Sequence, residues 1–252
     1  MLIRIKLKAF TLAEVLITLA IIGVVAAMTI PTLMKNYQKS VVEKRLVNTY
    51  AVIVNMFKLA EVDHGDPSKW GMDKFAGITS QDGIVDYFIN TYMMPYLQGA
   101  SYKDRKTAKD WGYPDGIKNP DGSVVLPPNA TPKAIRLKNG VYIFPAIASS
   151  TREDVKYFFA VNLFIDIDGP SGSNVVGKDV YQMQQLFDSV GPHLSGEMNW
   201  DRHVYTGAFT YKTPFTRQEL FDYCSQGDHM AKACGALIKK DGWKIKDDYP
   251  WF

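Results

Sequence analysis

Residues 8–20 read Lys8-Ala9-Phe10-Thr11-Leu12-Ala13-Glu14-Val15-Leu16-Ile17-Thr18-Leu19-Ala20. They open an apolar run from Phe10 to Met34 that contains 25 residues and one charged side chain, Glu14. As a helix rising about 1.5 Å per residue, this run is roughly 37 Å long, which is enough to cross a hydrocarbon core of about 30 Å. A carboxylate in such a helix is costly in lipid, so Glu14 is expected to be functional.

The residues before the run help to separate three interpretations. Arg4, Lys6 and Lys8 are not accompanied by an acidic residue, which predicts a cytoplasmic N-terminus. A cleaved secretory signal would have an apolar region of about 7–15 residues followed by a small-x-small site, but this run is longer and Ala9 precedes it. A plain signal anchor explains the length and the basic start. It explains neither Glu14 nor a Phe directly after a small residue.

The third interpretation is a resemblance to the class III signal of type IV prepilins and type II secretion pseudopilins. That pattern is a short basic leader, a small residue, Phe-Thr-Leu-x-Glu and an apolar helix, and here it starts at Ala9 and ends at Glu14. The resemblance implies that a prepilin peptidase cuts after Ala9 and methylates the new amino terminus of Phe10. Ala9 replaces the usual Gly but keeps the site small. The other implied partners are further pilin or pseudopilin subunits, an inner-membrane assembly platform and membrane lipid.

Two residues of the run are expected to act in assembly. In a bundle of subunit helices, Glu14 can meet the amino terminus of Phe10 on a neighbouring subunit, which gives a buried carboxylate an opposite charge. Pro31 lacks an N–H and is expected to kink or loosen the helix near the outer membrane face. Alternatively, Pro31 is a simple break between a membrane segment and a soluble helix.

The whole chain divides into four predicted parts. Residues 1–9 are a basic leader peptide, 10–34 a transmembrane and assembly helix, 35–62 a soluble continuation of that helix, and 63–252 a globular domain. Within the globular domain, 63–130 is expected to be a large, mostly irregular insertion with one short helix. The continuation is expected to end near residue 62, because Asp63-His64-Gly65-Asp66-Pro67 is dense in helix-breaking residues.

Composition limits the possible partners. The chain has 29 basic and 26 acidic residues, and the two counts become equal once Arg4, Lys6 and Lys8 are removed. A neutral chain argues against a broad nucleic-acid-binding surface. The apolar run and the resemblance to prepilins imply a location in the cytoplasmic (inner) membrane, with a single pass, the N-terminus inside and the globular domain outside, followed by a periplasmic or extracellular filament.

The strand pattern predicts an α+β fold. Residues 134–137 and 141–144 flank Asn139-Gly140, which is a strong hairpin signal. Residues 155–167 alternate over a long stretch and are expected to form a central strand packed on the N-terminal helix. A long helix, a loop region and then antiparallel strands match the α/β roll of pilins.

Asp166 and Asp168 lie in the sequence Asp-Ile-Asp-Gly-Pro-Ser-Gly-Ser-Asn that follows this long strand. Alternate Asp oxygens and a Gly turn suit a hard cation such as calcium. The resemblance adds to this interpretation, because some secretion pseudopilins have a calcium site in the loop after the sheet. The alternative is an Asp/Gly turn whose side chains cap backbone groups, since the spacing and terminal Glu of an EF-hand are absent from the sequence.

The C-terminal segment is expected to be helical. Thr216-Arg217-Gln218-Glu219 is a capping-box sequence that should start a short helix through about Cys224, and 230–240 should form another. Cys224 and Cys234 are the only cysteines. An even pair in an exported chain favours one disulfide, with two free thiols or a metal site as the alternatives. Many pilins close a C-terminal loop in this way, so the resemblance agrees.

No catalytic motif is visible in the sequence. The four histidines are scattered, and no GxSxG or Gly-rich phosphate loop occurs. The resemblance implies that the chain is a non-enzymatic, prepilin-like subunit that is cleaved, N-methylated and assembled into a type II secretion pseudopilus or type IV pilus. The alternative is a filament-tip or membrane-anchored binding module, such as an adhesin or a DNA or glycan binder.

Overall fold

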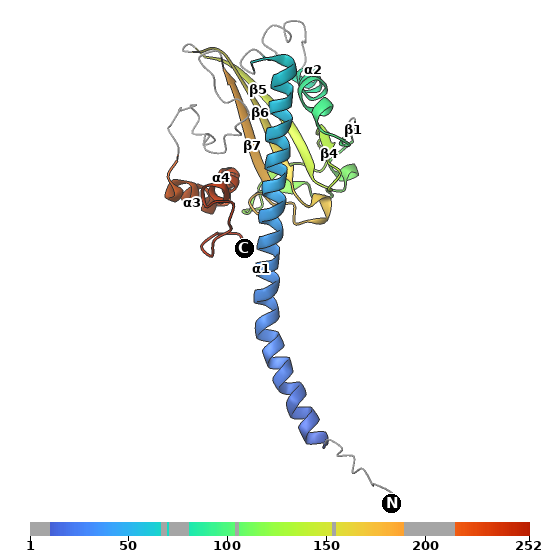
Figure 1. The fold of residues 1–252 in the computed structure, drawn as a ribbon, viewed down its shortest axis with the longest axis vertical. Coiled ribbons are helices and arrows are strands. Elements are labelled where there is room, and N and C mark those ends of the chain that lie inside the picture. The colour runs from blue at the N-terminus through green and yellow to red at the C-terminus, as the bar shows by residue number, and fades with distance from the viewer. Residues whose placement is uncertain (1–10, 67–69, 71–80, 104–105, 153–154, 189–214) are drawn as a thin grey trace, which may run out of the picture. The chain divides into compact units, whose positions relative to one another are not determined.

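The computed structural model describes residues 11–66, 70, 81–103, 106–152, 155–188 and 215–252 (Figure 1). The chain divides into two compact units, Met1–Val41 and Val42–Phe252. Helix α1 (Leu12–His64) contributes to both units. It ends at His64, directly before Gly65, whose positive φ of 74° is a conformation that glycine adopts readily.

Within the second unit, α1 packs one face in the core. Its buried positions recur at helical spacing and are Leu46, Thr49, Ile53, Met56, Phe57 and Ala60. The apolar members join a single core that also contains the inward-facing residues of the sheet. At the end of the helix, Phe57 packs on Phe88, with ring centroids 6.4 Å apart.

Five antiparallel strands form the main sheet in the order β1-β4-β5-β6-β7. Their bounds are β1 (Ser101–Lys103), β4 (Ala134–Arg136), β5 (Tyr142–Arg152), β6 (Val155–Asp166) and β7 (Val180–Asp188). A long helix with this antiparallel sheet confirms the predicted α+β fold. The long predicted strand is β6, which lies between β5 and β7.

The predicted hairpin is also confirmed. Strands β4 and β5 pair with Arg136 opposite Tyr142, and the Gly140 N–H donates to the Leu137 carbonyl over 3.1 Å. Gly140 has a φ of 87°, a left-handed conformation that favours glycine at this point of the turn.

The region 63–130 contains more regular structure than the sequence predicts. The expected short helix is α2 (Gln81–Phe88), which continues into a π-helical turn (Ile89–Met93) and a 3-10 turn (Met94–Tyr96). Strand β1 pairs with β4, so this region supplies an edge strand of the main sheet. Strands β2 (Ile117–Lys118) and β3 (Val124–Leu126) form a second, two-stranded sheet. The sequence analysis does not predict these three short strands, and turns and loops connect them.

The C-terminal segment is helical, as predicted. Helix α3 (Arg217–Gln226) starts at Thr216 with the complete capping box to Glu219 and ends at Gly227, which has a φ of 76°. The second expected helix begins as a 3-10 helix, η7 (His229–Ala233), and continues as α4 (Cys234–Lys240). The following tail is tied to the core, because the Tyr249 hydroxyl donates to the Gly177 carbonyl over 2.6 Å.

Candidate functional site

The N-terminal part of α1 exposes its apolar side chains to the surroundings. They include Leu12, Val15, Leu16, Ile17, Leu19, Ile21, Ile22, Val24, Val25, Met28, Ile30, Leu33 and Met34, each more than 40% exposed. The helix is long and apolar enough to cross a membrane, and none of its most apolar stretch is buried. Apolar side chains around the whole circumference of a helix require lipid or other helices as partners.

Glu14 caps the start of this helix. Its Oε2 accepts hydrogen bonds from the Thr11 N–H and the Thr11 hydroxyl, both over 2.9 Å, and the Glu14 N–H donates to the Thr11 hydroxyl over 3.2 Å. This reciprocal arrangement is a capping box, which satisfies N–H groups that a helix terminus leaves unpaired. It holds the carboxylate at the end of the helix that adjoins Phe10. The predicted processing residues Ala9 and Phe10 lie outside the described residues.

Pro31 lies inside the helix, which runs through it without interruption. Helical hydrogen bonding therefore does not end at Pro31. The ring removes one backbone donor, so the carbonyl of Ala27, four residues earlier, lacks its usual helical partner.

At the other end of the chain, Cys224 and Cys234 form the predicted disulfide, with their Cα atoms 4.7 Å apart. Both cysteines are fully buried, and the bond joins α3 to the start of α4. A second connection is ionic: the guanidinium of Arg217 contacts both carboxylate oxygens of Asp241, at 2.7 and 2.8 Å, and both of Asp248, at 2.9 Å each. The two connections make the C-terminal helices one cross-linked element.

The predicted calcium ligands lie where β6 ends. Asp166 is completely buried, and its Oδ2 accepts the Tyr113 hydroxyl over 2.7 Å. Its Oδ1 accepts the N–H groups of Asp168 and Gly169 over 3.2 and 2.8 Å. Burial, together with the nearby carboxylates of Asp179 and Asp168, raises the pKa of Asp166 to about 7, although the Tyr113 hydrogen bond lowers it.

Asp179, the residue directly before β7, organises the other side of this loop. It accepts the Ser173 hydroxyl and the N–H groups of Asn174 and Val175, over 2.9, 2.7 and 2.8 Å. A Cβ at Gly172 would collide with carboxylate oxygens of both Asp168 and Asp179, so the two side chains converge on that residue.

These hydrogen bonds agree with the turn interpretation, in which the carboxylates cap backbone groups. Across the described ranges, no group of three His, Cys, Asp or Glu side chains is placed to hold a metal ion. The calcium site at Asp166 and Asp168 stays a prediction. A calcium titration of the thermal unfolding midpoint would test it, because a bound ion raises the midpoint and a turn without an ion leaves it unchanged.

Two family models match the chain. Residues 6–30 match the prokaryotic N-terminal methylation motif, which confirms the resemblance to type IV pilins and pseudopilins. Residues 32–251 match a family of unknown function (DUF6613). The chain belongs to that family. Its N-terminal segment is thus pilin-like, and its remaining residues match the family of unknown function. Neither a curated protein nor a solved structure matches the chain.

Some of these features can be predicted from the sequence, and others cannot. The methylation motif, the apolar helix and the disulfide follow from local sequence. The contacts of Asp179 do not, because this residue reaches the Asp166 loop only after β7 pairs with β6.

Proposed function

We propose that this pilin-like protein is cleaved after Ala9, methylated on Phe10 and assembled through α1 into a type II secretion pseudopilus or a type IV pilus. Before assembly it is held in the cytoplasmic membrane, with the globular domain on the outer side. Its role is structural, and its partners are the prepilin peptidase, an inner-membrane assembly platform and neighbouring subunits.

The observation that carries this proposal is the methylation motif at the start of α1, together with the exposure of the most apolar stretch of that helix. Burying apolar surface contributes about 25 cal/mol per Å², so this stretch of the helix gains most of its stability from partners rather than from its own chain. Lipid supplies them before assembly, and helices of neighbouring subunits supply them in a filament. The same surface can therefore serve both states.

Glu14 provides the specificity of assembly in this proposal. In the free chain its carboxylate caps the helix through Thr11. In the filament it exchanges one of these contacts for the charged amino terminus of Phe10 on a neighbouring subunit. An ion pair that forms only in one register favours that register, because an unpaired charge in an apolar bundle is costly.

The test compares Glu14→Ala and Glu14→Gln with wild type in the native host. Glu61→Ala, which removes a carboxylate from the globular end of the same helix, is the matched control. We expect both Glu14 variants to reach wild-type levels in the membrane but to yield at least about tenfold fewer filaments, the equivalent of a lost interaction of about 1.4 kcal/mol. Wild-type filament levels in Glu14→Ala would refute the pairing.

A further inference from the structure

One face of β6 packs in the core, and the other lines a surface depression. Val161, Leu163 and Ile165 are fully buried. Asn162 and Phe164, which alternate with them, are half-buried and lie on the opposite face. Two adjoining hollows lie on that face, and both are lined by Ala146 and Phe164.

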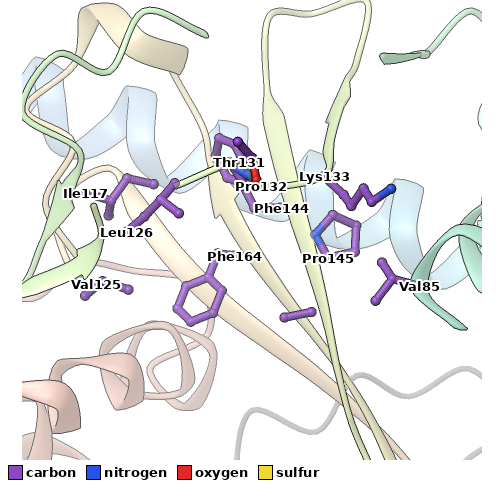
Figure 2. A pocket seen from close by; sticks show the side chains of 11 residues that line it. Val85, Ile117, Val125, Leu126, Thr131, Pro132, Lys133, Phe144, Pro145 and Phe164 are labelled. Atoms are coloured by element: carbon purple, nitrogen blue, oxygen red, sulfur yellow. The ribbon is translucent and has the colours of Figure 1, made fainter. Parts of the chain in front are cut away.

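The first hollow is apolar and has a volume of about 320 Å³, near the lower end of the usual range for small-molecule sites. Figure 2 shows its walls: Phe144 and Pro145 from β5, Leu126 and Val125 from β3, and Phe164 from β6. Lys133 also lines it, but its Nζ lies 2.6 Å from Asp86 Oδ2. Because that charge is neutralised, the first hollow suits an apolar group.

The second hollow has a volume of about 380 Å³ and contains an unsatisfied acceptor. Gln182 is only 5% exposed, and its Nε2 donates to Asn162 Oδ1 over 3.0 Å. Its Oε1 is buried and accepts no hydrogen bond from the part of the chain that the structure describes. Leaving a buried acceptor unpaired is costly, so a ligand N–H or O–H that reaches this oxygen binds favourably.

The same hollow contains a cation. Lys232 of η7 places its Nζ 5.7 Å from the centroid of the Phe164 ring. Burial lowers the pKa of Lys232, and no carboxylate of the described residues forms an ion pair with its Nζ. A partly desolvated ammonium without an anion is stabilised by a ligand carboxylate.

We propose that these two hollows bind the carboxyl-terminal residue of a peptide whose last side chain is apolar. The side chain enters the first hollow, the N–H of the residue donates to Gln182 Oε1, and the terminal carboxylate pairs with Lys232 Nζ. A fatty acid would leave Gln182 unpaired, and a sugar has no apolar branch to fill the first hollow. The proposal does not rest on filament assembly, because binding is a property of the single chain.

The probe is N-acetyl-4-fluorophenylalanine, which combines an aromatic side chain, one N–H and a carboxylate. Its fluorine NMR line width is followed as the full chain in detergent micelles is added. The corresponding amide, which lacks the negative charge, is the control ligand. We expect the acid to bind about tenfold more tightly than the amide, as a charge-assisted hydrogen bond implies.

Three variants locate the site. Lys232→Met should weaken binding of the acid about tenfold and abolish its advantage over the amide, and Gln182→Met should weaken both ligands alike. Lys240→Met, at an exposed position on the neighbouring α4, should bind as wild type does. Tryptophan fluorescence confirms that each variant is folded. The proposal is overturned if wild type does not broaden the fluorine line of the acid, or if wild type binds the acid and the amide equally. It is also overturned if Lys232→Met binds the acid as tightly as wild type does.

Discussion

Ile22 and Ile53 are both isoleucines of helix α1, yet they have opposite environments. Ile22 is 62% exposed, whereas Ile53 is completely buried. Leu12–Met34 of α1 is apolar around its circumference, whereas the later part buries one apolar face in the core and carries charged side chains on its other faces. One continuous helix therefore obtains its stability from two sources: from other molecules near its start, and from its own domain near its end.

Truncating each isoleucine tests this difference in environment most strongly. Ile53→Ala should lower the free energy of unfolding of the globular part by about 2–5 kcal/mol, because it leaves a cavity. Ile22→Ala should change it by no more than about 0.5 kcal/mol. Urea unfolding followed by tryptophan fluorescence measures this directly, since all five tryptophans lie after His64. Equal losses in the two variants would contradict the division.

The disulfide should have the next largest effect, and only in the globular part. Reduction, or the double variant Cys224→Ala with Cys234→Ala, should lower the free energy of unfolding by about 2–4 kcal/mol. The measurement is the urea midpoint with and without reductant. The Cys variant itself is the control for reductant, because its midpoint should not respond. A wild-type midpoint that also ignores reductant would show that the bond does not stabilise α3 and α4.

Asp166 should make the globular part sensitive to pH. Because the pKa of Asp166 is raised to about 7, above the value of about 3.9 in an unfolded chain, the folded state binds more protons between these values. The free energy of unfolding should therefore fall as the pH rises from about 4 to about 7, by at most about 1.4 kcal/mol per pH unit.

Asp166→Asn keeps an oxygen for the backbone N–H groups of Asp168 and Gly169 but removes the titration. Its free energy of unfolding should change less steeply over this range, and Asp222→Asn, an exposed carboxylate on α3, is the matched control. The account of Asp166 fails if the Asn variant retains the slope of wild type.

The smallest effect is expected at the ion pair between α1 and the C-terminal tail. Lys244 Nζ lies 2.8 Å from Glu43 Oε2, but the Lys244 side chain is 70% exposed. Lys244→Met should cost less than about 1 kcal/mol, because solvent and salt screen such pairs. Urea midpoints at low and high salt check this. A loss above 2 kcal/mol would place this pair among the main interactions of the tail.

Features that depend on local interactions can be predicted from the sequence, whereas features that depend on long-range pairing cannot. The capping box at Thr216, the turn at Gly140 and the apolar run to Met34 depend on neighbouring residues, so their patterns are visible in the sequence. Strands β1 and β7 were not predicted. The first has only three residues, and the second interrupts its apolar alternation with glutamines. Their pairing with β4 and β6 supplies what their own sequences lack.

The two hollows illustrate the same limit. In the sequence, neither Gln182 nor Lys232 belongs to a recognisable binding motif. Only the sheet order and the position of η7 place them in one hollow with Phe164. A binding site assembled from β6, β7 and a 3-10 helix has no local pattern, so no sequence motif could have indicated it.

The most direct test of the central claim is the intact mass and N-terminal peptide map of the native protein extracted from membranes. The account predicts a chain that starts at Phe10 and carries one N-methyl group. A chain that still starts at Met1 would contradict prepilin processing, and the exposed apolar helix would then be an ordinary membrane anchor.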